Sequence, residues 1–409
     1  MDLVDARFET LQSFAESDLH DRLLPWWMEH MPDDENGGFY GVVLPDNTPD
    51  KTADRFIVLF SRLVWTFSSA YRVTGRAVYK AYARRAYEYF VKCFYDQANG
   101  GFFTSVKYDG SPSSTYKFVY GNAFAVYALA EYARAFDDKA AVCLAQETVD
   151  KLDTHLYDAQ SLGYYETADA DWQRTPNRRG MNRFSEEEKT MNTHLHLIEA
   201  YTNLLRAAPS STLRSRVREL LYLFLNKITD RQTHHFYYFQ RRDWTPTTPV
   251  QSFGHDIEGS WLLYETAEAL CEPEAVRAAR DVCVNIARAV CDMGFHESGA
   301  LASEYDPSTR TYLYTHFSWW EQAEAVVGCL NAWQLTREGS FLDRAAQSIA
   351  YIDNTFVDRK LGGWHARVGM DGTPDPSPDK ANGFICPYHN ARMSLEIMER
   401  IERIAKHNG

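Results

Sequence analysis

A turn that recurs along the whole chain constrains the fold more than any other feature. A Gly-Gly-aromatic sequence or a weaker copy of it occurs six times, ending at Phe39, Phe102, Tyr164, Phe236, Ala300 and Trp364. Successive copies are roughly 60–70 residues apart, which is long enough for two helices and a loop. One helical hairpin cannot bury its apolar face alone, so neighbouring units must stack.

The segments between the turns have helical periodicity. Apolar residues recur at three- and four-residue spacing in 63–67, 123–135 and 193–205, whereas strand-like runs are few and short. Six helical hairpins closed in a ring would make an all-α (α/α)6 barrel, which we predict as a single domain over residues 1–409. An open superhelical solenoid is the alternative. Closure is favoured because six units can close and the terminal units are no more polar than the others.

Composition and net charge limit the kinds of molecule that this protein can bind. The net charge is −13, so neither nucleic acid nor an anionic membrane surface has a basic footprint to bind. No apolar run approaches the ~20 residues of a membrane span, and the N-terminus lacks the pattern of a signal peptide. We therefore expect a cytoplasmic protein, a monomer or homodimer. Aromatic residues make up 14% of the chain, which favours a ring-lined pocket for a small carbohydrate.

The cysteines indicate the compartment. Their number is odd and they form no Cys-x-x-Cys pair, which predicts buried thiols in a reducing cytoplasm, not disulfides or a zinc site. The seven are Cys93, Cys143, Cys271, Cys283, Cys291, Cys329 and Cys386.

Two groups of polar residues interrupt apolar helices. Asn192 and His196 are four residues apart and share a helix face, so His194 must point elsewhere. His255 and Glu258 are three apart, and a carboxylate beside an imidazole raises its pKa and fixes its orientation. This pair suits proton transfer, although a buried structural hydrogen bond at a helix start fits the same spacing.

A third group surrounds His389, which follows Pro387 near the start of the last long helix. The adjacent rings of Trp319 and Trp320 suit a sugar platform, or are ordinary core rings. Arg62 lies inside an apolar helix face, where it could hold an oxyanion or pair with an acid.

No cofactor motif accompanies these residues. A Walker loop, a G-x-G-x-x-G after a strand, and H-E-x-x-H are all missing from the sequence. The histidines also lack the short spacing of a helical metal site. We therefore expect proton transfer by side chains alone, with no cofactor and no metal.

Several motifs in order resemble one known family. The sequences MNTHLH from Met191, GHDIE from Gly254, WWEQAE from Trp319 and PYHNARM from Pro387 are similar to the N-acylglucosamine 2-epimerase superfamily, and most similar to its cellobiose 2-epimerase branch. The family's (α/α)6 barrel agrees with the repeat. The resemblance implies cofactor-free epimerisation at C2 of a reducing-end aldose, interconverting glucose and mannose units, as in β-1,4-linked disaccharides such as cellobiose.

The resemblance also implies residue roles. His255 and His389 would exchange the C2 proton from opposite faces of the sugar, and His196 would assist at the O1 and ring-opening end. Arg62 would stabilise the enediolate, and Glu258 would pair with the catalytic histidine. The chemistry is consistent, because inversion needs a base on one face and an acid on the other, and an imidazole pKa near ~6.5 suits both.

The remaining implied residues bear on substrate choice. Asn192 and Tyr120 would contact the sugar. Cellobiose epimerases usually carry Trp five residues before the last catalytic histidine, where this chain has Phe384. A smaller ring there, beside the Pro- and Asp-rich segment 371–382, could weaken the subsite for a second glucose. A mannose 2-epimerase, or an aldose–ketose isomerase acting on free mannose or glucose, is therefore the alternative.

Two other classes compete. A glycoside hydrolase would need two carboxylates flanking a glycosidic bond, and Glu258 and Glu324 are available, but the three histidines would then have no function. A non-catalytic sugar binder is the other, because a fold alone does not establish activity.

Overall fold

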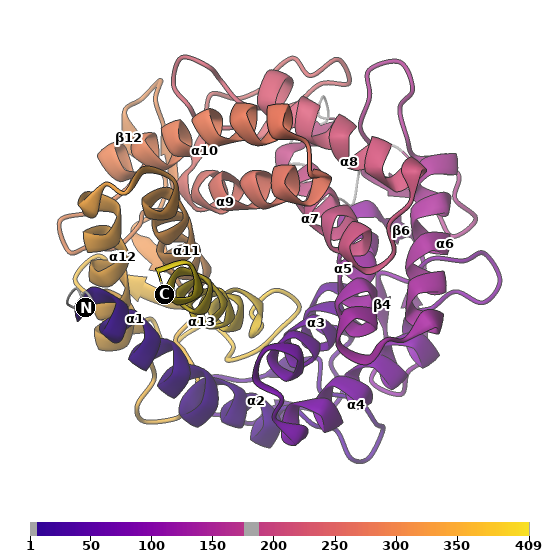
Figure 1. The fold of residues 1–409 in the computed structure, drawn as a ribbon. Helices are drawn as coiled ribbons and strands as arrows, with labels where there is room; N and C mark the ends of the chain where they lie inside the picture. The colour runs from indigo at the N-terminus through magenta and orange to yellow at the C-terminus, as the bar shows by residue number, and fades with distance from the viewer. Residues whose placement is uncertain (1–5, 176–187, 409) are drawn as a thin grey trace.

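Two concentric rings of helices dominate the structure, a computed structural model that describes residues 6–175 and 188–408 (Figure 1). The inner helices are α3 (Ile57–Thr74), α5 (Val119–Phe136), α7 (Met191–Ala207), α9 (Phe253–Leu270), α11 (Trp319–Thr336) and α13 (Tyr388–Asn408). The outer helices are α1 (Ala6–Ser17), α2 (Leu24–His30), α4 (Ala77–Phe94), α6 (Lys139–His155), α8 (Ser211–Leu223), α10 (Pro273–Met293) and α12 (Gly339–Tyr351). Short π-helical segments continue three outer helices: η1 (Asp18–Leu23), η2 (Phe224–Ile228) and η3 (Ile352–Phe356).

The inner ring is closed. Each inner helix contacts the next one along the chain, and the last, α13, contacts both α11 and α3. Helix α1 in turn packs against α12 and α13, so the chain's first helix completes the outer ring beside its last (Figure 1). The predicted all-α (α/α)6 barrel is therefore confirmed, and the open solenoid is wrong.

Short antiparallel strands join neighbouring units. The strand before each of five inner helices pairs with a strand in the next loop, in the pairs β3–β4, β6–β7, β8–β9, β10–β11 and β13–β14. The sixth junction is a bridge in which the Val43 N–H donates to the Ala381 carbonyl (2.9 Å). The strands are β1 (Val42–Val43), β2 (Pro49–Asp50), β3 (Arg55–Phe56), β4 (Ser105–Val106), β5 (Pro112–Ser114), β6 (Lys117–Phe118), β7 (Thr167–Ala168), β8 (Lys189–Thr190), β9 (Phe239–Gln240), β10 (Gln251–Ser252), β11 (Glu304–Asp306), β12 (Thr311–Tyr312), β13 (His316–Ser318) and β14 (Arg367–Gly369).

The recurring turns all lie in the loops that run from an outer helix to the next inner helix, and therefore at one end of the barrel. In five units an isolated bridge joins a residue after the outer helix to the aromatic residue that ends the turn, such as Tyr95 to Phe102. In the remaining unit Phe295 bridges Leu301, one residue beyond the turn. Glycine is required at Gly38, where φ is +65° and a Cβ atom would lie 2.5 Å from the Tyr89 ring. The turn positions the start of each inner helix at the same end.

Buried ion pairs anchor several turns, a feature that we did not predict. The Lys117 ammonium lies 2.7 Å from the Asp96 carboxylate, with both side chains almost fully buried. The base comes from the strand before an inner helix and the acid from the turn. The same arrangement recurs as Arg55–Asp33 and Lys189–Asp158, and Lys380 pairs with Asp358 from the loop before α13.

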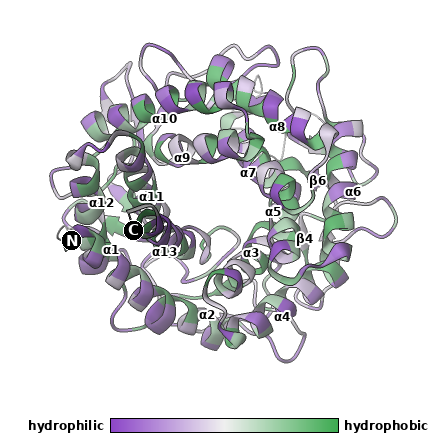
Figure 2. Cartoon of the chain, viewed as in Figure 1, coloured by the Kyte–Doolittle hydropathy of each residue, from purple (hydrophilic) through white to green (hydrophobic). Residues whose placement is uncertain are grey.

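The helices of the outer ring are amphipathic, whereas those of the inner ring are largely buried. Outer helices carry both hydrophobic and hydrophilic patches (Figure 2), as expected when one face packs against the inner ring. In α7, residues 191–205 are all buried. No helix among the described residues is both long and apolar enough to cross a bilayer.

The prediction that all seven cysteines are buried was wrong. All seven are free thiols, but Cys143 and Cys271 are exposed and Cys93 and Cys291 are half-buried. Cys143 lies on the outer helix α6, and Cys271 is the residue that ends the inner helix α9, in the short connection to α10.

Candidate active site

The predicted site residues from five inner helices gather at the end of the barrel that carries the turns. Tyr120, His255 and His389 lie in the first turn of α5, α9 and α13, and Arg62 and His196 lie in the second turn of α3 and α7. All five are buried. Helix N-termini carry partial positive charge, so converging N-termini favour a negative charge that forms among them.

Arg392 connects the site, and we had assigned it no role. Its guanidinium donates to Glu199 and Glu258 in very short hydrogen bonds, and to Glu324 at 2.6 Å. All four side chains are almost fully buried. The carboxylates come from α7, α9 and α11, so one cation on α13 holds three other inner helices in register around the site.

His389 is held by one of these carboxylates. Its Nδ1 lies 2.8 Å from Glu324 Oε1, and the Trp261 indole N–H donates to Glu324 Oε2 at 3.0 Å. Burial lowers the pKa of His389 well below its ordinary value, with the positive charges of Arg62 and Arg392 adding to the effect. The imidazole is therefore neutral near pH 7. Both oxygens of Glu324 already accept hydrogen bonds, from Arg392 and Trp261, so we assign the proton of the remaining contact to His389 Nδ1, which leaves Nε2 as the basic nitrogen.

His196 has a similar carboxylate partner. Its Nδ1 lies 2.9 Å from Glu199 Oε2, and its ring meets the Tyr120 ring edge-on at 5.0 Å. Burial lowers the pKa of His196 to about 3, and burial raises the pKa of the Tyr120 hydroxyl to about 12. Both groups are neutral at physiological pH.

His194 makes a separate set of contacts, in agreement with the helical spacing. Its Nδ1 bonds the Thr190 carbonyl at 2.7 Å, and its Nε2 accepts the Tyr164 N–H at 2.9 Å. Tyr164 is the aromatic residue of one recurring turn. Asn122 accepts the N–H of Phe102 in the preceding unit in the same way, so His194 has a structural role.

His255 and His389 both pack against the ring of Trp320. The Trp320 ring centroid lies 4.8 Å from that of His255 and 5.4 Å from that of His389. The Nδ1 atom of His255 bonds the Ser252 hydroxyl at 2.7 Å. The prediction that Glu258 pairs with His255 needs correction, because Glu258 Oε1 binds Arg392 and lies 4.0 Å from His389 Nδ1.

Arg62 is the cation of the site without a partner acid. It is 3% exposed, and no carboxylate of the described chain lies within ion-pair distance of it. Its guanidinium donates to the Tyr120 hydroxyl at 3.2 Å and lies over the rings of Phe124 and Tyr388 at 4.3 and 4.7 Å. A buried positive charge held by rings and a phenol can stabilise an anion.

The predicted sugar contacts occupy different settings. The carboxamide oxygen of Asn192 is buried and has no hydrogen-bond partner in the described part of the chain. Phe384 is 42% exposed and its ring lies 5.3 Å from that of Phe56. Trp319 lines a narrow space with Trp26 and Cys386, whereas the ring of Trp320 packs against His255 and His389.

Among the residues that the structure describes, two clusters have ligand atoms close enough to one another to hold a metal ion. They are His196 with Glu199 and Glu258, and Glu258 with Glu324 and His389, each within 4.8 Å. Arg392 already bonds all three of these carboxylates. Its guanidinium places a positive charge among these carboxylates.

Comparison with known proteins places this geometry in a family. The N-acylglucosamine 2-epimerase (GlcNAc 2-epimerase) family matches residues 37–391. This chain belongs to that family. A cellobiose 2-epimerase of Bacteroides fragilis is 36% identical over 390 residues, covering 95% of this chain and 99% of the relative.

Solved structures of the same family have the same fold as this chain. The structure of cellobiose 2-epimerase from Bacillus thermoamylovorans superposes with a TM-score of 0.91 at 33% identity, covering 96% of this chain and 100% of the other. A D-mannose isomerase of Marinomonas mediterranea is more distant, at 20% identity over 391 residues, covering 90% of this chain and 92% of the relative.

Proposed function

We propose that this protein is a cofactor-independent sugar 2-epimerase that interconverts glucose and mannose units at the reducing end of β-1,4-linked disaccharides such as cellobiose. The observation that carries the proposal is that His255 and His389, from two separate helices, both pack against the ring of Trp320. Two imidazoles that approach one ring from different helices suit proton exchange at opposite faces of a bound sugar.

Proton removal is assigned to neutral imidazoles. The C2 hydrogen becomes acidic only in the open-chain aldehyde, so the ring must open first, a step that we assign to His196 beside Tyr120. His389, with Nδ1–H bonded to Glu324, presents Nε2 on one face. His255, held at Nδ1 by Ser252, serves the other face. In the reverse reaction their roles exchange.

The enediolate needs a positive environment. Loss of the C2 proton leaves a planar anion with charge on O1 and O2. No acid of the described chain pairs with Arg62, so its guanidinium is available to the enediolate oxygens. The converging helix N-termini add partial positive charge. The unpaired oxygens of Asn192 and Glu258 can accept sugar hydroxyls.

Two observations support the disaccharide preference. The cellobiose 2-epimerase of Bacteroides fragilis is 36% identical and the D-mannose isomerase is 20% identical. Phe384 also keeps an exposed ring where a second sugar could stack. A hydrolase is disfavoured because Glu258 and Glu324 both accept hydrogen bonds from the same cation, Arg392, and the three histidines would have no function in hydrolysis.

NMR in D2O with no added cofactor tests the proposal, using cellobiose and mannose in parallel. We expect deuterium at C2 and the appearance of glucosyl-mannose from cellobiose. Exchange with mannose alone would move the assignment to a monosaccharide epimerase, and release of glucose would indicate a hydrolase.

Variants test the two-base mechanism in the same assay. His255→Ala and His389→Ala should each reduce epimerisation by ~10²–10⁴-fold, typical of a lost acid or base. Each should retain exchange in only one of the two epimers, because one face keeps its base. His30→Ala, in the outer helix α2, is the control. Near-normal epimerisation in either active-site variant would refute two-base catalysis.

A further inference from the structure

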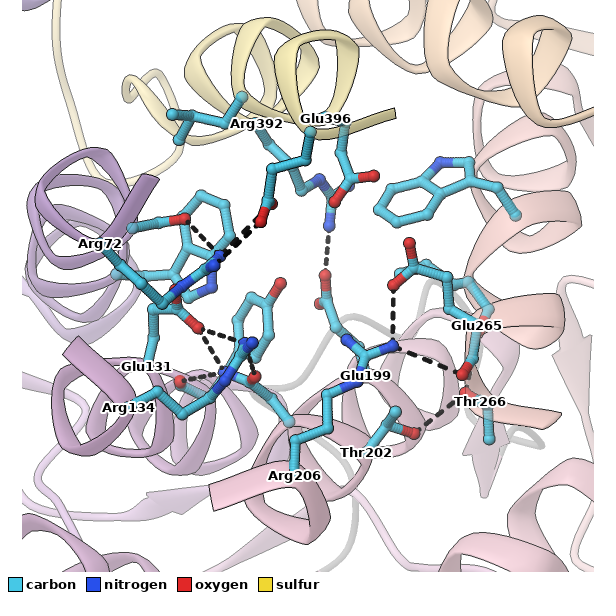
Figure 3. A pocket seen from close by; sticks show the side chains of 18 of the residues that line it. Arg72, Glu131, Arg134, Glu199, Thr202, Arg206, Glu265, Thr266, Arg392 and Glu396 are labelled. Atoms are coloured by element: carbon cyan, nitrogen blue, oxygen red, sulfur yellow. Dashed lines mark hydrogen bonds and ion pairs between the residues drawn. The ribbon is translucent and has the colours of Figure 1, made fainter. Parts of the chain in front are cut away.

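A second polar space lies behind Arg392, toward the C-terminal ends of the inner helices (Figure 3). This back cavity has a volume of about 290 Å³ and is lined from α3, α5, α7, α9 and α13. The side chains of Arg72, Arg134 and Arg206 surround it in the view, and Glu265 and Glu396 complete the wall. The catalytic histidines are not among its lining residues.

The lining is charged but balanced. Five arginines and five glutamates line the back cavity, and most are paired there, as in Arg72–Glu131 at 2.6 Å, Arg134–Glu131 at 2.9 Å and Arg206–Glu265 at 3.1 Å. An ion would therefore gain little net attraction. A neutral molecule whose hydroxyls both donate and accept would match alternating carboxylates and guanidiniums.

The volume of the back cavity and its aromatic lining indicate more closely which ligands could fit. At ~30 Å³ per water, the space equals roughly ten water molecules, and it is smaller than most of the ~300–1,000 Å³ pockets of drug-sized ligands. Trp65, Tyr127 and Trp261 contribute rings, with Trp65 and Tyr127 stacked at 5.4 Å. Aromatic rings can pack against the C–H faces of one sugar ring, while the neighbouring guanidinium and carboxylate groups can bind its hydroxyls.

The cavity and the catalytic cluster share a wall. Glu199 and Arg392 line the back cavity, while Glu199 Oε2 also holds His196 Nδ1 at 2.9 Å and Arg392 holds Glu324. A molecule that competes for Glu199 or Arg392 from behind would alter the hydrogen bonds that orient His196 and His389.

We propose that the back cavity is a second binding site for a neutral, monosaccharide-sized polyol. The methyl glycoside of mannose is a suitable probe, because its ring cannot open and it cannot be epimerised. Binding to the folded state raises the thermal unfolding temperature, so the readout does not depend on the proposed catalytic activity.

The unfolding temperature should rise with methyl α-D-mannopyranoside beyond the general stabilisation given by raffinose, a trisaccharide too large for the cavity. The rise should be at least halved in Arg206→Gln and in Arg134→Gln, which remove guanidiniums from the wall. It should persist in Arg218→Gln, an exposed arginine paired with Glu272 outside the cavity, and in Trp320→Ala at the catalytic end. A rise that Trp320→Ala abolishes and both cavity variants keep, or no rise beyond raffinose, would overturn the proposal.

Discussion

His194 and His196 are two residues apart on α7 and have opposite expected roles. His194 Nε2 accepts the Tyr164 N–H, so His194→Ala leaves a buried donor unpaired and should lower the free energy of unfolding by about 1–3 kcal/mol. Its turnover per folded molecule should stay close to that of the unmodified chain. His196→Ala should instead lower kcat for epimerisation. Urea unfolding and steady-state kinetics on both variants measure this, and the reverse ranking of activities would refute the assigned roles.

Residue roles within one helix could be predicted from spacing, but contacts between helices could not. The three-residue spacing of His196 and Glu199 was present in the sequence, as was the four-residue spacing of Tyr388 and Arg392. The convergence of Glu199, Glu258 and Glu324 on Arg392 joins residues 68 to 193 positions apart. Such a cluster depends on how helices close into a ring, which is why Glu258 was assigned to its near neighbour His255 and not to Arg392.

At the scale of single elements, the buried pairs beneath the turns should control stability. Lys117→Met leaves the Asp96 carboxylate buried without its cation, and loss of one partner of a buried pair typically costs about 3–5 kcal/mol. Adding Asp96→Asn should recover part of that loss, because the uncompensated charge is then removed.

An exposed pair provides the matched control. Lys51 and Glu35 form an ion pair with side chains that are 56% and 66% exposed, so Lys51→Met should lower the free energy of unfolding far less than Lys117→Met does. Equal losses in Lys51→Met and Lys117→Met, measured by urea unfolding, would contradict the anchoring role. The turn sequence predicted where each unit begins. It did not predict the pair of Lys117 and Asp96, because these residues are 21 positions apart in the sequence.

At the scale of the whole molecule, closure should determine how the barrel opens. In an open array of repeats each unit contacts only its neighbours, and the end units are supported on one side. Here α13 packs against both α3 and α11, and the Val43–Ala381 bridge joins the first loop to the last. The terminal units are thus held as firmly as the central ones.

Native-state hydrogen exchange tests this closure. Amides of α3 and α13 should exchange as slowly as those of α7, because all three are inner helices with two inner neighbours. The variant Ala381→Pro lacks the N–H that donates to the Val43 carbonyl, so it should disturb the bridge between the first loop and the last. It should speed exchange in α13 and α3 before α7, while Ala168→Pro at an internal junction serves as the comparison. A gradient of exchange from both ends in the unmodified chain would mean that the ring is not closed in solution.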